Sequence, residues 1–230
     1  MGAGHRIETP PQMTNFTTVL WDLDGTIINS SPGVFDSFRK TFIKLGLPVL
    51  SDEEMLPFMG PPLTTTFREF LGFDEKLTQE CLSVYRDFYL NHGGALNATL
   101  YPGVLETISA SKAAGRFNSL ATSKAEVGTR LVGEHFDFLK FFEVLGTASN
   151  DEKRNTKAKV ISYALDALQK INADLSRVIL IGDRIHDIEG AREHGIEVCL
   201  VKWGFGNDDE WAQADHLVEN ATELQKLLGL

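Results

Sequence analysis

The stretch Thr18-Val19-Leu20-Trp21-Asp22-Leu23-Asp24-Gly25-Thr26, residues 18–26, is an apolar run that ends in two carboxylates separated by one residue. Side chains of a strand repeat every two positions, so Asp22 and Asp24 begin on the same side of the chain. Gly25 allows the backbone to turn sharply where a side chain would obstruct it. Two like charges this close are unfavourable unless a cation lies between them. The stretch therefore predicts a metal-assisted nucleophile beside an acid/base group.

Four other short apolar runs have the length and composition of buried strands: Phe117–Ala121, Phe142–Leu145, Val178–Ile181 and Val198–Val201. Each is adjacent to a segment with helical spacing, and these segments are Val104–Ala114, Ala125–His135, Thr156–Gln169 and Ile185–His194. Strands that alternate with helices predict an α/β fold with a mostly parallel sheet covered on both faces. Ligands bind at the carboxyl ends of the strands in such sheets. Asp22, Thr122 and Asp183 fall at or just past these ends.

Residues 32–99 interrupt this alternation with helical patterns only. The signals are a helix at Pro32–Leu45, a capping box at Ser51-Asp52-Glu53-Glu54, a helix near Leu63–Leu71 and a helix capped by Asp74. The last helix carries an apolar stripe, which we interpret as core packing: Leu77, Cys81, Val84, Tyr85 and Phe88. We expect an all-helical cap at 32–99, inserted into a core made of 16–31 and 100–230, with a disordered leader at 1–15.

Composition and charge exclude several functional classes. The 230 residues carry a formal net charge of -10, which disfavours a nucleic-acid surface. The two cysteines, Cys81 and Cys199, are far apart and indicate neither a disulfide framework nor a zinc site. The first fifteen residues lack the apolar segment of a signal peptide, and no run has the 18 or more apolar residues that span a membrane. We expect a soluble cytoplasmic protein, a monomer or a homodimer.

Two more strand ends carry groups suited to a phosphate and a metal. Ser119-Leu120-Ala121-Thr122-Ser123-Lys124 ends a strand with hydroxyls and with backbone amides that open a helix, which suits a phosphate oxygen. Gly182-Asp183-Arg184-Ile185-His186-Asp187 supplies two carboxylates four residues apart. Asp183 is placed to ligate a hard cation, and Asp187 either ligates it or holds its neighbours through hydrogen bonds.

With these four aspartates in this order, residues 17–228 resemble the haloacid dehalogenase superfamily. The resemblance implies a Rossmann-like core and Mg²⁺ as the cofactor. It implies that Asp22 is the nucleophile and that Asp24 protonates the leaving oxygen and then activates water. Thr122, with Gly25 and Ser123, would bind the phosphoryl group. Asp22, the backbone carbonyl of Asp24, Asp183 and the nearby Asp187 would form the metal site.

The family also places a lysine at the start of a helix, between the second and fourth motifs. Two lysines compete for this position: Lys153, which follows an acidic loop, and Lys157, which opens a helical run. Many relatives carry a Lys-Pro pair here, and this sequence has none. We favour Lys157 because it stands at the helix start. A lysine and Mg²⁺ together would offset the charge of four carboxylates and an incoming phosphate.

The nature of Asp24 separates the reactions of the superfamily. A carboxylate at this position suits an oxygen leaving group, so phosphate monoesters are favoured over organic halides. A phosphonatase would need a cap lysine poised for a Schiff base, and nothing marks Lys40, Lys44 or Lys76 for that role. The alternatives that stay open are a phosphomutase of the β-phosphoglucomutase type and a non-catalytic member that binds phosphometabolites or a partner protein.

Several features resemble the phosphoglycolate phosphatase or 5′-nucleotidase-like branch, including the Gly60-Pro61-Pro62-Leu63 turn and Tyr85-Arg86. The turn either faces the substrate when the cap closes or simply joins two helices. Arg86 could grip a carboxylate or second phosphate, although an exposed helix arginine is the commoner state. We expect a small phosphate ester as substrate: phosphoglycolate-like, or a nucleotide or sugar phosphate.

Overall fold

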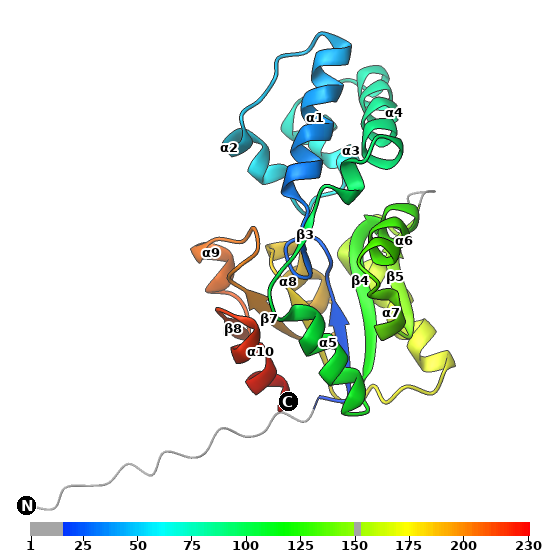
Figure 1. Ribbon diagram of the computed structural model, residues 1–230, viewed down its shortest axis with the longest axis vertical. Helices are drawn as coiled ribbons and strands as arrows, with labels where there is room; N and C mark the ends of the chain where they lie inside the picture. Colours follow the sequence, from blue (N-terminus) through cyan, green and yellow to red (C-terminus); the bar gives the residue numbers. More distant parts are fainter. Residues whose placement is uncertain (1–15, 150–152) are drawn as a thin grey trace, which may run out of the picture.

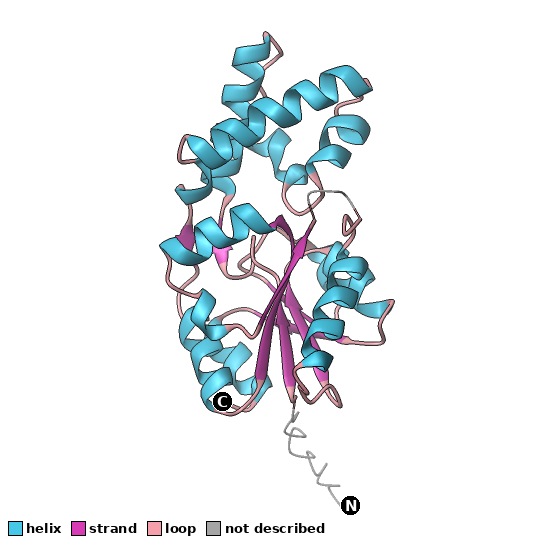
Figure 2. Cartoon of the chain, turned by 90° about the vertical axis from the view of Figure 1, so that its right-hand side faces the viewer, coloured by secondary structure: helices cyan, strands magenta, loops and turns pink. Residues whose placement is uncertain are grey.

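The computed structural model describes residues 16–149 and 153–230. Its main element is a six-stranded sheet with the order β5-β4-β1-β6-β7-β8, in which all neighbouring strands are parallel. The strands are β1 (Thr18–Trp21), β4 (Phe117–Ala125), β5 (Val144–Ala148), β6 (Val178–Gly182), β7 (Glu197–Val201) and β8 (His216–Val218). The predicted α/β class is confirmed, since helices cover both faces of this parallel sheet (Figures 1 and 2).

The two faces of the sheet have separate apolar cores because side chains alternate along β1. Leu20 points to the face covered by α7 (Lys157–Lys170) and α8 (Ile185–Arg192), where it packs with Ile161 and Ile188. Val19 and Trp21 point to the other face, which is covered by α5 (Val104–Ala113), α6 (Glu126–His135) and α10 (Ala221–Leu228). The helices of the core are α5 (Val104–Ala113), α6 (Glu126–His135), α7 (Lys157–Lys170), α8 (Ile185–Arg192), α9 (Asp208–Trp211) and α10 (Ala221–Leu228).

A helical segment stands above the carboxyl edge of the sheet (Figure 1). It contains α1 (Ser31–Leu45), α2 (Asp52–Met55), α3 (Leu63–Thr65), α4 (Glu75–Asn91), 3₁₀ turns at Leu56–Phe58 and Gly94–Leu96, and a π-helical turn at Thr66–Phe70. Two short antiparallel strands, β2 (Ile28–Asn29) and β3 (Thr99–Leu100), connect this segment to the sheet. Phe38 anchors its interior through ring contacts with four aromatic side chains, those of Phe42, Phe58, Phe67 and Tyr85.

The local signals in this segment give the expected helix starts. The Ser51 capping box is present, with Glu54 bound to the Ser51 backbone and hydroxyl. The Asp74 side chain accepts a hydrogen bond from the backbone N–H of Leu77 and so begins α4. The helix expected at Leu63–Leu71 instead forms α3 followed by the π-helical turn.

Some elements differ from the expectation. The run Phe142–Leu145 gives a strand only from Val144, because a 3₁₀ turn precedes it and Phe142 packs edge-on against Phe138. Strand β4 continues to Ala125, so Thr122 lies within the strand, before a register shift, and α6 begins only at Glu126. The edge strand β8, the small ribbon and α10 have no counterpart among the predicted elements. The expected leader at 1–15 lies outside the described residues. None of the helices in the described part is long and apolar enough to cross a membrane.

Candidate active site

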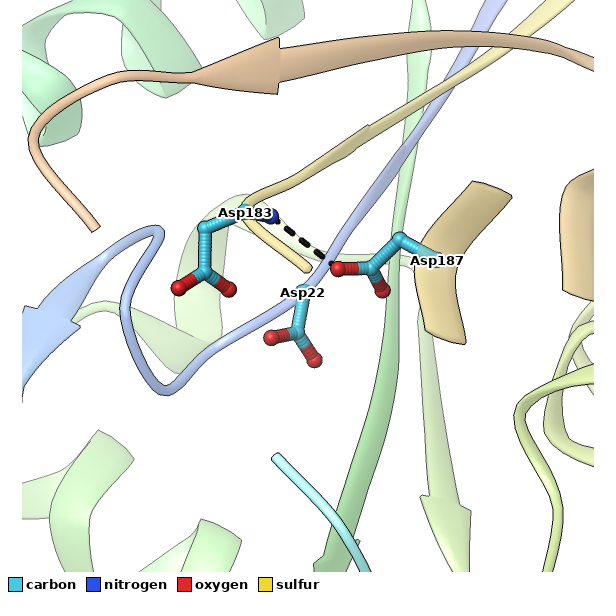
Figure 3. Close-up of side chains that lie close together, drawn as sticks. All are labelled: Asp22, Asp183 and Asp187. Atoms are coloured by element: carbon cyan, nitrogen blue, oxygen red, sulfur yellow. Dashed lines mark hydrogen bonds between the residues drawn. The ribbon is translucent and has the colours of Figure 1, made fainter. Parts of the chain in front are cut away.

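Parallel pairing brings the two motif strands together at the carboxyl edge of the sheet. Trp21 pairs with Ile181, and the Asp22 N–H donates to the Ile181 carbonyl at 2.8 Å. Asp22 and Asp183 therefore leave adjacent strands at the same level. Together with Asp187 they form a buried group in which one carboxylate oxygen from each lies within 4.8 Å of the others (Figure 3). Asp22 and Asp183 are 161 positions apart in the sequence, and the pairing of β1 with β6 brings them together.

Asp187 is held by the start of α8. Its Oδ2 accepts hydrogen bonds from the backbone N–H groups of Asp183 at 3.0 Å and of Arg184 at 3.1 Å. Its Oδ1 lies 2.7 Å from Lys157 Nζ. Both oxygens are thus engaged with protein groups, an arrangement typical of a carboxylate that orients its neighbours.

Lys157 is the first residue of α7 and reaches the nucleophile position. Its Nζ lies 2.6 Å from Asp22 Oδ1 and donates to the carbonyl of Ala121 at 2.8 Å. The Thr156 side chain caps the helix by accepting from the Lys159 N–H at 3.3 Å. Burial lowers the pKa of Lys157, but Asp187 and Asp22 raise it further, and the resulting pKa lies above its usual range. Of the two lysines considered, Lys157 contacts Asp22, whereas Lys153 is exposed.

The three carboxylates of the acidic group, those of Asp22, Asp183 and Asp187, share one lysine, Lys157. Burial raises the pKa of Asp22 to about 7, and Lys157 only partly opposes this effect. Burial also raises the pKa of Asp183, and the charges of Asp187 and Asp22 raise it further. A divalent cation at this position would favour the ionised forms of both carboxylates.

The structure also supplies a place where a cation fits. Asp183 Oδ1 is buried without a hydrogen-bond partner among the described residues, while Oδ2 accepts from the Phe205 N–H at 2.7 Å. Two glycines make room for this carboxylate: a Cβ on Gly25 would lie 2.0 Å from Asp183 Oδ2, and one on Gly204 would lie 2.5 Å from it. Gly25 also has a φ of 87°, which disfavours other residues. Carboxylate oxygens are the donors that Mg²⁺ prefers.

Asp24 lies outside this acidic group and has its own cation. Its carboxylate lies 3.0 Å from Lys124 Nζ, and the same Nζ donates to the Tyr89 hydroxyl at 2.6 Å. Burial lowers the pKa of Lys124, but Asp24 and Tyr89 raise it, so that the resulting pKa lies above the usual range. Because Tyr89 belongs to α4 and Lys124 to β4, this contact joins the helical segment to the sheet. The sequence analysis gives neither side chain a role, and its signal for this contact is the position of Lys124 two residues after Thr122.

A second contact joins the two parts on the other side of the site. Arg184 pairs with Glu210 of α9, with 3.1 Å between Nε and Oε2, and donates to the backbone carbonyl of Met59. Neither Arg184 nor Glu210 was singled out in the sequence. The nearby Gly60 has a φ of 104°, and a Cβ there would lie 3.5 Å from Arg184.

A cavity of about 440 Å³ lies between these two contacts. The proposed nucleophile, acid/base group, lysine and phosphate-binding residues line it, namely Asp22, Asp24, Lys157, Thr122 and Ser123. Thr122 is buried, and its hydroxyl accepts from the Lys124 N–H at 3.2 Å. Arg86 reaches the same cavity from the helical segment, but its side chain is exposed. Tyr85 of the predicted apolar stripe packs in the core of that segment and also lines the cavity.

Comparison with known proteins agrees with this geometry. A family model described as haloacid dehalogenase-like hydrolase matches residues 19–201. The chain is 36% identical over 191 residues to tyrosine-protein kinase PtkA of Mycobacterium tuberculosis, which is 83% of this chain but 64% of that protein, so the match spans less than two thirds of the relative. It is 30% identical to a 5′-nucleotidase of Pseudomonas aeruginosa, covering 93% of this chain and 96% of that one. A predicted phosphatase from Clostridium acetobutylicum superposes with a TM-score of 0.85 at 32% identity, covering 94% and 99% of the two chains.

Proposed function

The chain belongs to the haloacid dehalogenase-like hydrolase family, and we propose on that premise that it is a phosphatase. In this proposal it hydrolyses a small phosphate monoester with Mg²⁺ through an aspartyl phosphate on Asp22, and relatives named 5′-nucleotidase and predicted phosphatase support it. The observation that carries this proposal is the position of Lys157, 2.6 Å from Asp22, beside a buried group of carboxylates. Asp22 therefore has two neighbours in the site: Lys157, which pairs with its Oδ1, and the Asp183 carboxylate.

In the first half of the proposed reaction, an Asp22 carboxylate oxygen attacks phosphorus and the ester oxygen leaves. Asp24 gives this oxygen its proton, so the product is an alcohol. Thr122 and Lys157 bind the phosphoryl oxygens. Asp22 and Asp183, with the Asp24 backbone carbonyl, would hold Mg²⁺, which supplies charge stabilisation to the phosphoryl oxygens when bound.

In the second half, Asp24 accepts a proton from water, and the water oxygen attacks the phosphorus of the aspartyl phosphate. The bond between Asp22 and phosphorus breaks, which releases inorganic phosphate and restores the carboxylate. Asp187 does not react in this scheme. It holds Lys157 and the start of α8 in place through its two oxygens.

We further propose that the helical segment between β2 and β3 acts as a cap over a core made of residues 16–31 and 100–230. Two contacts across the site support this role, from Tyr89 to Lys124 and from the Met59 carbonyl to Arg184. A closed cap would exclude water until the substrate is bound.

The test is turnover of p-nitrophenyl phosphate with and without Mg²⁺ by the wild type, Asp22→Asn and a control. Asp166→Asn is a suitable control because Asp166 is an exposed carboxylate on α7. We expect Mg²⁺-dependent hydrolysis by the wild type and Asp166→Asn, and a loss of at least about 10³-fold in Asp22→Asn. Metal-independent turnover, or full activity in Asp22→Asn, would contradict the mechanism. β-Glucose 1-phosphate, followed by product analysis, tests the mutase alternative.

A further inference from the structure

Apolar side chains make up much of the cavity lining, and we call this part of it the apolar wall. The helical segment contributes most of them, and they are Phe58, Met59, Pro61, Pro62, Leu63 and Leu90. From the sheet side, Val127 on α6 completes this wall. A volume of about 440 Å³ is in the range of sites that enclose organic ligands much larger than a phosphate group. The space beyond the phosphate position is therefore suited to an organic body with apolar surface.

The cations that line the cavity are occupied by protein groups, with one exception among the described residues. Lys157 is held by Asp22 and Asp187, and Lys124 by Asp24. The third is His186, whose Nδ1 lies 3.6 Å from Glu189 Oε2. The exception is Arg86. A leaving group that carries a carboxylate or a second phosphate would have to draw a lysine away from its buried partner, which costs free energy.

The two arginines of the lining differ in their availability. Arg184 is engaged by Glu210 and by the Met59 carbonyl. Arg86 is exposed, and it also lines a shallow groove on the outer side of α4 together with Gln79 and Asp87. A solvated arginine contributes no more than about fivefold to binding an anion, because water and salt screen it.

The helical segment and the core of the protein contact each other at two places beside the cavity. Tyr89 contacts Lys124 on one side of the cavity, and the Met59 carbonyl contacts Arg184 on the other. A Cβ on Gly128 of α6 would lie 3.7 Å from the Tyr89 ring, so α6 also packs against α4 near the cavity. A bound leaving group would therefore meet this apolar wall directly.

We infer that the leaving group of the substrate is an uncharged body with apolar or aromatic surface, and that small anionic leaving groups such as glycolate are disfavoured. This inference rests on the proposed function and narrows its substrate class. It follows from the apolar wall, the occupied lysines and the single exposed arginine, which together favour burial of apolar surface over capture of a second negative charge.

Benzyl phosphate and 2-phosphoglycolate are suitable probes because both are esters of primary alcohols and differ mainly in charge. In saturating Mg²⁺, we expect the kcat/KM for benzyl phosphate to be at least about tenfold higher than the kcat/KM for 2-phosphoglycolate. A second pair, 2-naphthyl and phenyl phosphate, differs by one ring. Burial of roughly 50 Å² more apolar surface should favour the naphthyl ester by about tenfold.

Val127 allows the charge argument to be tested by substitution. Its side chain is 55% exposed at the cavity, so changes there should not prevent folding. Val127→Lys adds a cation and should lower the preference for benzyl phosphate over 2-phosphoglycolate by about fivefold. Val127→Met, of similar length without charge, should leave this preference within twofold of the wild type.

Three outcomes would overturn the inference. If the wild type prefers 2-phosphoglycolate, the proposed function stands and the apolar substrate class is wrong. The same holds if Val127→Met shifts the preference as much as Val127→Lys. If no phosphate ester is hydrolysed with Mg²⁺, the proposed function fails together with the inference.

Discussion

The replacement of Asp22 by asparagine should make the metal-free protein more stable at neutral pH. Burial raises the pKa of Asp22 from 3.8 to about 7; the charges of Asp187 and Asp24 add to this rise, and Lys157 opposes it only in part. Asparagine has the same shape but no charge. Lys157 keeps its contacts with Asp187 at 2.7 Å and with the Ala121 carbonyl at 2.8 Å. The substitution therefore removes a charge that is unfavourable in the absence of metal.

The magnitude follows from the difference between the two pKa values, 3.8 and about 7, which is about 3 pH units. Between these values the folded protein keeps a proton on Asp22 that the unfolded chain has lost. A raised folded-state pKa thus gives a stabilising contribution that is fully present below pH 3.8 and is lost as the pH rises through 7. At about 1.4 kcal/mol per unit, the loss amounts to about 4 kcal/mol as an upper bound.

The assay is urea unfolding of the wild type and Asp22→Asn in EDTA at pH values from 4 to 8. We expect the free energies of unfolding to converge near pH 4 and to differ by up to about 4 kcal/mol at pH 8, with the variant more stable. The difference between the two proteins cancels the titration of other groups. Mg²⁺ should stabilise the wild type more than the variant. A wild type that is as stable as the variant at pH 8 in EDTA would refute the reasoning.

Three further substitutions test other parts of the site. Lys157→Met should lower kcat by at least about 10³-fold and the free energy of unfolding by about 3 kcal/mol in EDTA; unchanged values in kinetics and urea unfolding would contradict its role. Lys124→Met should reduce turnover of alkyl phosphates about tenfold more than that of p-nitrophenyl phosphate, because nitrophenolate leaves without a proton; equal losses would mean that Lys124 does not position the proton donor. Gly25→Ala should weaken Mg²⁺ binding at least about tenfold in calorimetry, since the new Cβ would meet Asp183. Gly46→Ala is its control, with positive φ and nothing within 4 Å of the new Cβ, and an equal effect there would refute the steric argument.

The sequence was most informative where a local pattern fixes a local structure. Alternating strands and helices predicted the parallel sheet, and Ser51 and Asp74 predicted two helix starts through their capping groups. It was less informative at β8, a three-residue edge strand that contains an exposed leucine. The helix α10 was missed although its signals are present, since Asn220 caps it and Leu224 and Leu228 face the core.

In the site, too, the sequence predicted residues that belong to local motifs better than contacts between distant segments. Asp22, Asp24 and Asp183 could be chosen from motifs, because they follow strands at positions where parallel sheets present ligand-binding groups. Asp187 could be chosen with them because it lies four residues after Asp183, in the first turn of α8. Between Lys153 and Lys157, helix position alone gave a preference, and the contact with Asp22 came from the packing of α7 against the sheet.

The sequence by itself thus determined the alternation of strands and helices in most of the core, the acidic residues near the strand ends and the resemblance to a family of hydrolases. Only the tertiary structure decided which cation accompanies which carboxylate: Lys157 lies against Asp22, and Lys124 against Asp24. It also decided that the cavity wall is apolar, because that wall comes from a helical segment folded back over the sheet. The physical reason is that motifs report local geometry, whereas charge pairing and cavity shape depend on which distant segments pack together.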